Sequence, residues 1–143
     1  MEFVYTLFFL LIAFSVHEFF HAFVADRMGD PTPRLHGRLT LNPLAHIDLL
    51  GFASLMLFRL GWGKPVPVNP NNFKNYRVGE ALVSISGPVS NIVLAVFAVF
   101  LSRVFSPLAL LAVISFQLGV FNLLPIYPLD GFKLVGCFIP RRF

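Results

Sequence analysis

The stretch His17-Glu18-Phe19-Phe20-His21 lies inside an apolar run that extends from Phe3 to Val24. If this run is an α-helix, His17 and His21 are one turn apart, about 40° around the axis and roughly 6 Å along it. Both imidazoles can then bind one metal ion, and Glu18 lies close enough to act on a water at that ion. Because ionisable side chains are costly inside an apolar membrane helix, these three residues predict a functional metal site.

The composition of the chain is that of a membrane protein. Of its 143 residues, 57% are hydrophobic and only 13% are charged, whereas soluble domains carry about 25% charged residues. The first apolar run has no basic segment before it and continues into the metal motif, so it does not resemble a secretory signal peptide. We therefore predict an all-α polytopic membrane protein that forms a single membrane-embedded unit over residues 1–143.

Three segments are apolar enough and nearly or fully long enough to cross a bilayer, which takes about 20 helical residues. They are residues 3–25, 81–102 and 107–124. In the second segment, Gly87-Pro88 predicts a kink. Small or polar residues recur there at helical spacing, a pattern that lets membrane helices approach closely. These residues are Ser84, Gly87, Asn91, Ala95, Ala98 and Ser102.

A fourth apolar segment, residues 44–60, is too short for a regular crossing. Its run from Leu49 to Leu60 is only about 18 Å long as a helix, against a hydrocarbon core of roughly 30 Å. We predict a re-entrant or interfacial element that returns to its starting side and, with the loop 61–72, covers the metal site. Prolines alternate with Val66 and Val68 in that loop, so it can form at most an edge strand.

The basic residues predict the orientation of the chain in the cell membrane. Ten of the eleven lysines and arginines fall within residues 26–80 or after Asp130, and only Arg103 lies between the second and third spans. The positive-inside rule then places the N-terminus outside, and the long loop and the C-terminus in the cytoplasm. His17, His21 and Asp130 meet at a similar depth toward the cytoplasmic side. The same distribution, without aromatic residues interleaved in a basic patch, does not indicate a nucleic-acid partner.

A catalytic zinc normally takes three protein ligands and keeps a fourth position for water, so the two histidines need a partner. Asp130 is the best candidate, because the prolines before it end the helix and Gly131 lets the backbone turn its carboxylate into the bundle. Asp48 and His46 remain serious competitors. The other candidates are His36, Glu80 and the single cysteine, Cys137, which excludes an internal disulfide.

These residue types predict peptide hydrolysis. A zinc ion lowers the pKa of a bound water and polarises the scissile carbonyl, and Glu18 can take the water proton and pass it to the leaving amine. Asn91 and Asn122 can position the substrate backbone or the developing oxyanion. The alternatives are interhelical hydrogen bonds for the two asparagines and a packed His–Glu–His cluster without metal.

Three motifs, taken together, resemble the site-two protease family of intramembrane zinc metalloproteases. In chain order they are His17-Glu18-Phe19-Phe20-His21, Gly87-Pro88-Val89-Ser90-Asn91 and the stretch from Asn122 to Gly131, Asn-Leu-Leu-Pro-Ile-Tyr-Pro-Leu-Asp-Gly. Two further stretches, residues 37–43 and 61–70, are similar to the small prokaryotic branch of that family. The resemblance covers nearly the whole chain and extends to the order and separation of the motifs.

The resemblance implies a three-helix catalytic core in which His17, His21 and Asp130 bind zinc and Glu18 is the catalytic base. It implies substrates that are themselves transmembrane segments, often of signalling proteins that undergo regulated intramembrane proteolysis. The chain ends thirteen residues after Asp130, where many relatives continue into a further helix. It leaves no room for a PDZ or nucleotide-sensing module, which predicts a minimal or a truncated form.

The favoured function is that of an intramembrane zinc endopeptidase. One alternative is a membrane protein that binds or transports metal, which would show a polar path or an inverted repeat; the chain shows neither, and Glu18 has no role in it. The other alternative is an inactive relative that acts as a binding partner, against which the intact Glu18 argues. The sequence does not predict the substrate, the cleavage site, the regulator or the oligomeric state.

Overall fold

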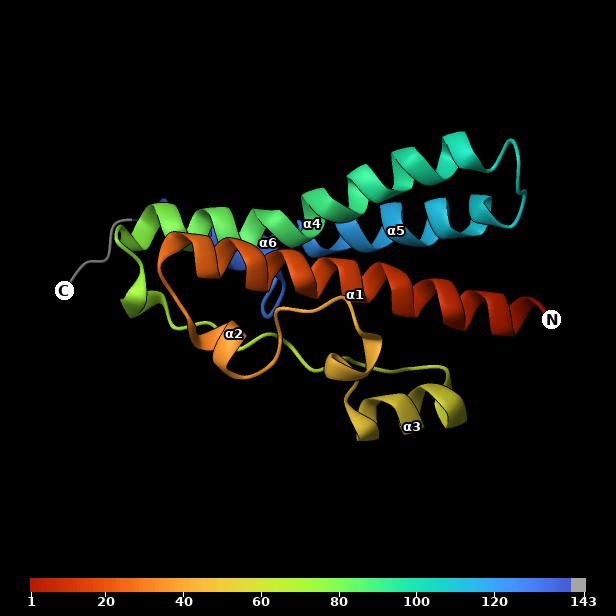
Figure 1. Cartoon of the computed structure of the whole chain (residues 1–143), viewed down its shortest axis with the longest axis horizontal. Helices are drawn as coiled ribbons and strands as arrows, with labels where there is room; N and C mark the ends of the chain where they lie inside the picture. The colour runs from red at the N-terminus through yellow and green to blue at the C-terminus, as the bar shows by residue number, and fades with distance from the viewer. Residues whose placement is uncertain (140–143) are drawn as a thin grey trace.

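The computed structural model describes residues 1–139, and its regular elements there are all helices (Figure 1). The α-helices are α1 (Glu2–Met28), α2 (Thr32–Leu35), α3 (Leu49–Phe58), α4 (Tyr76–Leu101), α5 (Leu108–Asn122) and α6 (Asp130–Gly136), and short 3₁₀ turns cover Pro43–Ala45 and Pro70–Asn72. The predicted all-α class is therefore confirmed for the described part of the chain. Two helices, α1 and α4, are long and apolar enough to cross a membrane, whereas crossing by α5 stays a prediction.

The three longest helices, α1, α4 and α5, lie side by side and form the body of the molecule (Figure 1). Their shared core contains mostly small side chains, with Phe9 and Leu111 as its large members. The predicted small-residue stripe of α4 lies in these contacts: all of its members are buried except Ser102. Small residues allow the close helix approach that places side chains of all three helices around one point.

Helix α4 begins earlier than its predicted span, and the proline predicted to kink it lies inside the helix. It begins five residues before residue 81, because the Asn75 side chain accepts a hydrogen bond of 3.2 Å from the Val78 N–H and caps the first turn. Pro88 lies inside the helix without ending it. In Figure 1 the first part of α4 runs beside α1 and the second part diverges from it, as expected for a helix with an internal proline.

The end of α1 is tied to a loop that is distant in sequence. Gly29 has a φ of 110° and ends the helix, and the completely buried carboxylate of Asp30 follows it. Asp30 accepts hydrogen bonds from the Asn69 N–H at 2.7 Å, the Asn72 amide at 2.8 Å and the Thr32 N–H at 3.1 Å. The carboxylate therefore anchors the segment before α4 to the cytoplasmic end predicted for α1.

Residues 61–70, which we call the strap, run along α1 from α3 back toward Asp30. The strap forms no strand and pairs with the chain at one bridge, between Ile47 and Gly63, in agreement with its prolines. The Lys64 N–H donates to the His46 carbonyl at 2.8 Å, and Arg38 donates to the Lys64 carbonyl at 3.2 Å. These contacts hold the strap in one position beside α1.

Helix α3 lies apart from the three-helix body, alongside the N-terminal half of α1 (Figure 1). The Asp48 side chain caps it by accepting from the Gly51 N–H at 2.8 Å. At its far end, the Arg59 guanidinium lies 3.9 Å from the centre of the Phe3 ring. Residues 44–60 thus extend along α1 nearly to its beginning, and the strap brings the chain back.

Candidate metal centre

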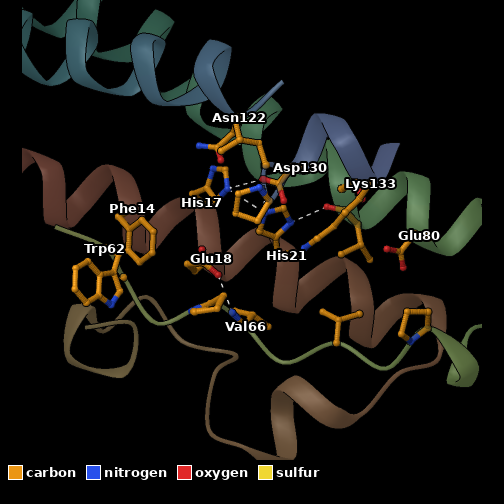
Figure 2. Close-up of a pocket in the computed structure, with 18 residues that line it drawn as sticks. Phe14, His17, Glu18, His21, Trp62, Val66, Glu80, Asn122, Asp130 and Lys133 are labelled. Carbon is orange, nitrogen blue, oxygen red and sulfur yellow. Dashed lines mark hydrogen bonds and ion pairs between the residues drawn. The ribbon is translucent and has the colours of Figure 1, made fainter. Parts of the chain in front are cut away.

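His17, Glu18, His21 and Asp130 line one cleft of about 550 Å³ between α1, the strap and the other helices (Figure 2). All four side chains are buried. The histidines and Glu18 come from the middle of α1, and Asp130 is the first residue of α6. The structure thus brings Asp130 to three residues that precede it by more than 100 positions in the sequence.

The three predicted ligand atoms converge on one point. Nε2 of His17 and Nε2 of His21 are 3.0 Å apart, and Oδ2 of Asp130 lies 3.0 Å from the first and 3.1 Å from the second. Three ligands of a tetrahedral zinc with bonds of about 2.0–2.1 Å are roughly 3.3 Å apart. The nitrogen and oxygen donors therefore fit zinc in chemistry and in spacing. Within residues 1–139 this is the one group of three or more His, Cys, Asp or Glu that could hold a metal.

Gly87 gives the two histidines their space. A Cβ at this position would lie 2.5 Å from Nε2 of His21 and 2.7 Å from Nε2 of His17. The backbone of α4 therefore passes directly against the ligand atoms. Any side chain at residue 87 would compete with a metal ion for the same volume.

Asp130 reaches the histidines because α6 begins against the end of α5. A Cβ on Gly131 would lie 2.1 Å from the Leu123 carbonyl oxygen, so only glycine permits this approach. Burial by itself raises the pKa of the Asp130 carboxyl, but the hydrogen bonds to His17 and His21 hold this pKa well below its usual value. The carboxylate is therefore anionic and suited to a cation.

Hydrogen bonds outside the triad orient both imidazoles. Nδ1 of His21 donates to the Val83 carbonyl at 2.7 Å, which leaves the lone pair of Nε2 for a metal. Nδ1 of His17 lies 3.0 Å from the Asn91 amide, and Oδ1 of Asn91 is buried with no partner in the described part of the chain. With the amide turned over, that oxygen accepts from Nδ1–H and frees Nε2 of His17 as well.

Glu18 is not part of the ligand triad but points toward the strap (Figure 2). Its Oε2 accepts a hydrogen bond of 2.9 Å from the Val66 N–H. The carboxylate is thus held next to the histidines without occupying the place of a third ligand. This is the arrangement expected of a base beside a metal.

The competing ligand candidates have other partners. Asp48 caps α3, His46 bonds the Thr40 carbonyl at 2.9 Å, and His36 bonds the Thr32 carbonyl at 2.9 Å. Cys137 donates to the Lys133 carbonyl, and Glu80 lines the cleft outside the triad. Of all the candidates, the structure places Asp130 alone with the two histidines.

The two asparagines are in different positions. Asn122 lines the cleft, and its amide nitrogen donates to the Leu118 carbonyl at 2.9 Å. Asn91 is completely buried, contacts His17 and does not line the cleft. Asn91 is therefore placed to orient the ring of His17. Contact with the substrate stays a prediction for Asn122.

Sequence reasoning missed several contributors to the site. Lys133 lines the cleft (Figure 2), and its spacing of three residues from Asp130 on α6 is a signal that could have found it. The contributions of Val66 and Val83 come from backbone groups, for which the side-chain pattern carries no signal.

Comparison with known proteins gives a consistent set of matches. Residues 100–143 match the model of "Peptidase family M50", a range that includes Asp130 but not the histidines. The chain is 37% identical over 147 residues to "Putative zinc metalloprotease YwhC" of Bacillus subtilis, with 92% of this chain and 67% of that protein covered. It is 36% identical to "Putative zinc metalloprotease Rip2" of Mycolicibacterium smegmatis and of Mycobacterium tuberculosis, over 136 and 135 residues. The chain spans about half of each Rip2 protein, 52%. No solved structure matches the chain.

Proposed function

The chain belongs to peptidase family M50, the site-2 proteases, and from this premise we propose that it is an intramembrane zinc endopeptidase. It hydrolyses peptide bonds in or near transmembrane segments of membrane-protein substrates. The observation that carries the proposal is the convergence of Nε2 of His17, Nε2 of His21 and Oδ2 of Asp130 within 3.1 Å of one another, next to a carboxylate that is not a ligand.

The ligand triad and the polar residues next to it have distinct roles in this reaction. His17, His21 and Asp130 would hold the zinc ion, which would supply the Lewis acidity for activating a water and polarising the scissile carbonyl. Glu18, fixed by the Val66 N–H, takes the proton of the attacking water and delivers it to the leaving amine. Asn91 orients His17, and Asn122 offers its amide to the substrate backbone.

The substrate has to present one carbonyl outside a regular helix. An intact membrane helix keeps its backbone amides in internal hydrogen bonds, so a segment with Gly, Pro or Asn near the cut is the preferred substrate. The cleft between α1 and the strap has room for such an unwound segment, since its volume is about 550 Å³. Equal cleavage of a uniformly stable poly-leucine helix would argue against this preference.

The experiment that tests the proposal measures zinc content and cleavage of a transmembrane model substrate by the purified protein. Glu18→Gln is expected to keep about one zinc per chain and to lose cleavage, and His17→Ala to lose both. Glu2→Gln is the matched control, because Glu2 is an exposed residue of the same helix. Substantial cleavage by zinc-loaded Glu18→Gln refutes the role of Glu18. Zinc binding by a wild-type protein that cleaves nothing favours the metal-binding or inactive-relative alternatives.

A further inference from the structure

A second cavity lies next to the metal cleft and has no part in the proposed chemistry. It is lined by α1, α3, α5 and the strap, and six of its residues define what we call the side pocket: Leu10, Phe14, His46, Phe52, Leu55 and Leu118. Phe14, Trp62 and Gly63 line both the side pocket and the metal cleft. Figure 2 shows Phe14 and Trp62 together at one end of the metal cleft. The two spaces are therefore neighbours that share one wall.

The side pocket is close to the reaction centre. Phe14 precedes His17 by three residues on α1, which is about 4.5 Å along a helix axis. An extended peptide advances roughly 3.3 Å per residue. A substrate segment whose scissile carbonyl lies at the histidines therefore brings a side chain one or two residues away to the entrance of the side pocket.

Size and lining favour one kind of occupant. The side pocket has a volume of about 200 Å³, and an apolar cavity of about 150 Å³ lined by aliphatic and aromatic side chains is large enough to bind benzene. Apart from His46 and three glycines, its lining residues are aliphatic or aromatic. His46 is completely buried, its Nε2–H is used by the Thr40 carbonyl, and Nδ1 has no partner within residues 1–139.

We propose that the side pocket binds one aromatic side chain of the substrate, next to the scissile bond, and thereby selects where the chain cuts. This proposal rests on the proposed protease function. The occupant is a ring because the cavity has the volume of one and shares its wall with the metal cleft. Leu55 lies on α3, outside the three-helix body, and lines the side pocket but not the metal cleft.

The test uses full-length protein in bilayers and model substrates that differ at single positions within three residues of the mapped cut. The substrates carry Ala, Leu, Phe or Trp there. Leu55→Trp fills the side pocket and Leu55→Ala enlarges it. Leu57→Trp and Leu57→Ala are the matched controls, because Leu57 lies on the same helix, is 74% exposed and does not line the pocket.

At one position the wild type is expected to cleave the Phe substrate at least about tenfold faster than the Ala substrate. Leu55→Trp should remove this preference and spare the Ala substrate, Leu55→Ala should shift it toward Trp, and both Leu57 variants should behave as wild type. The same change in the Phe-to-Ala ratio is expected for binding affinity when the Leu55 variants are combined with Glu18→Gln.

An equal loss for every substrate in Leu55→Trp, or no positional preference in the wild type, overturns the proposal and indicates a structural or lipid-filled cavity. A different result would refute the proposed protease function. The wild type would then cleave none of these substrates, or Glu18→Gln would cleave them as well as the wild type does.

Discussion

The backbone N–H of Val66 donates a hydrogen bond of 2.9 Å to Oε2 of Glu18, across 48 residues of sequence. A long carboxylate side chain has several rotamers, and this contact selects one of them for the proposed base. The strap is fixed on both sides of Val66, at Lys64 by the His46 carbonyl and at Asn69 by Asp30. The orientation of Glu18 therefore depends on a loop that shares no helix with it.

Replacing Val66 with proline removes the N–H while the strap keeps the non-helical backbone that Pro65 and Pro67 already impose. A hydrogen bond to a charged group contributes about 1.5–3 kcal/mol, so cleavage by Val66→Pro should fall roughly tenfold or more while zinc content is unchanged. Val66→Ala, which keeps the N–H, is the control and should retain most activity. Equal activities of the two variants would show that the amide does not position Glu18.

Gly87 should control metal binding without providing a ligand. Gly87→Ala places a methyl group 2.5 Å and 2.7 Å from the Nε2 atoms of His21 and His17, so the purified variant is expected to contain little zinc and to be inactive. Gly136→Ala is the matched control, because a Cβ there meets nothing within 4 Å. The measurement is the zinc content of each purified variant by elemental analysis. A Gly87→Ala protein with a full complement of zinc would contradict the placement of the ion between His17, His21 and Asp130.

Hydrophobicity and spacing predicted a large part of this molecule. The apolar runs give the approximate positions of α1, α4 and α5, because burial of apolar faces dominates helix placement in such a chain. The spacing of His17 and His21 gives two atoms of the site, and Gly131 gives the turn that brings in Asp130. Glycine is required at position 131 because the backbone there lies against the Leu123 carbonyl. No local sequence pattern reveals this contact.

What the sequence did not predict depends on contacts between distant backbone groups. The Val66 amide, the Val83 carbonyl and the anchoring of Asn69 by Asp30 have no signature in residue type. The side pocket lies between α1, α3, α5 and the strap, and the hydrophobic pattern of a short apolar helix such as α3 does not predict where that helix lies. The separate places of Asn91 and Asn122 follow from the rotation of α4 and α5, which hydrophobicity determines only roughly.

Asp30 should hold the strap in a pH-dependent manner. Burial raises the pKa of its carboxyl, but hydrogen bonds from Thr32, Asn72 and the Asn69 N–H outweigh burial and lower the pKa below the ordinary value of 3.8. Since the folded pKa is the lower one, the anchor stabilises the protein above about pH 4 and is lost as pH falls through the folded pKa. Limited proteolysis of the strap should therefore increase at strongly acidic pH.

In Asp30→Asn the strap should be cut by added protease already at neutral pH, because the amide nitrogen would face N–H groups that donate to the carboxylate in the wild type. Zinc should be retained, and cleavage of the substrate should be reduced. Asp26→Asn is the control, since Asp26 pairs with the exposed Arg34 at 3.3 Å, whereas the bonds from Asn69 and Asn72 are accepted by Asp30. A strap as resistant in Asp30→Asn as in the wild type would show that the anchor does not hold it.

The segment 44–60 is expected to enter the membrane and return without crossing it. Arg59 reaches the ring of Phe3 near the start of α1, yet the Asn72 side chain lies 2.8 Å from Asp30, directly after α1 ends. A complete crossing would separate Asn72 from Asp30 by the roughly 30 Å of the hydrocarbon core. The segment thus returns to the end of α1 from which it started, as predicted for a re-entrant or interfacial element that does not cross the membrane. The exposed leucines of α3, Leu49, Leu50 and Leu57, are suited to contact lipid.

Cysteines at Leu41 and Asn71, both exposed, test this path in a background with Cys137→Ala. An impermeant thiol reagent should label both from the cytoplasmic side, and Ser106→Cys, between α4 and α5, only from the opposite side. Asn72 itself is kept, because its side chain bonds Asp30. Labelling of Leu41→Cys and Asn71→Cys from opposite sides would establish α3 as a true span. It would also separate the strap from the end of α1, and with it Val66 from Glu18, because the anchor at Asp30 could not exist across a bilayer.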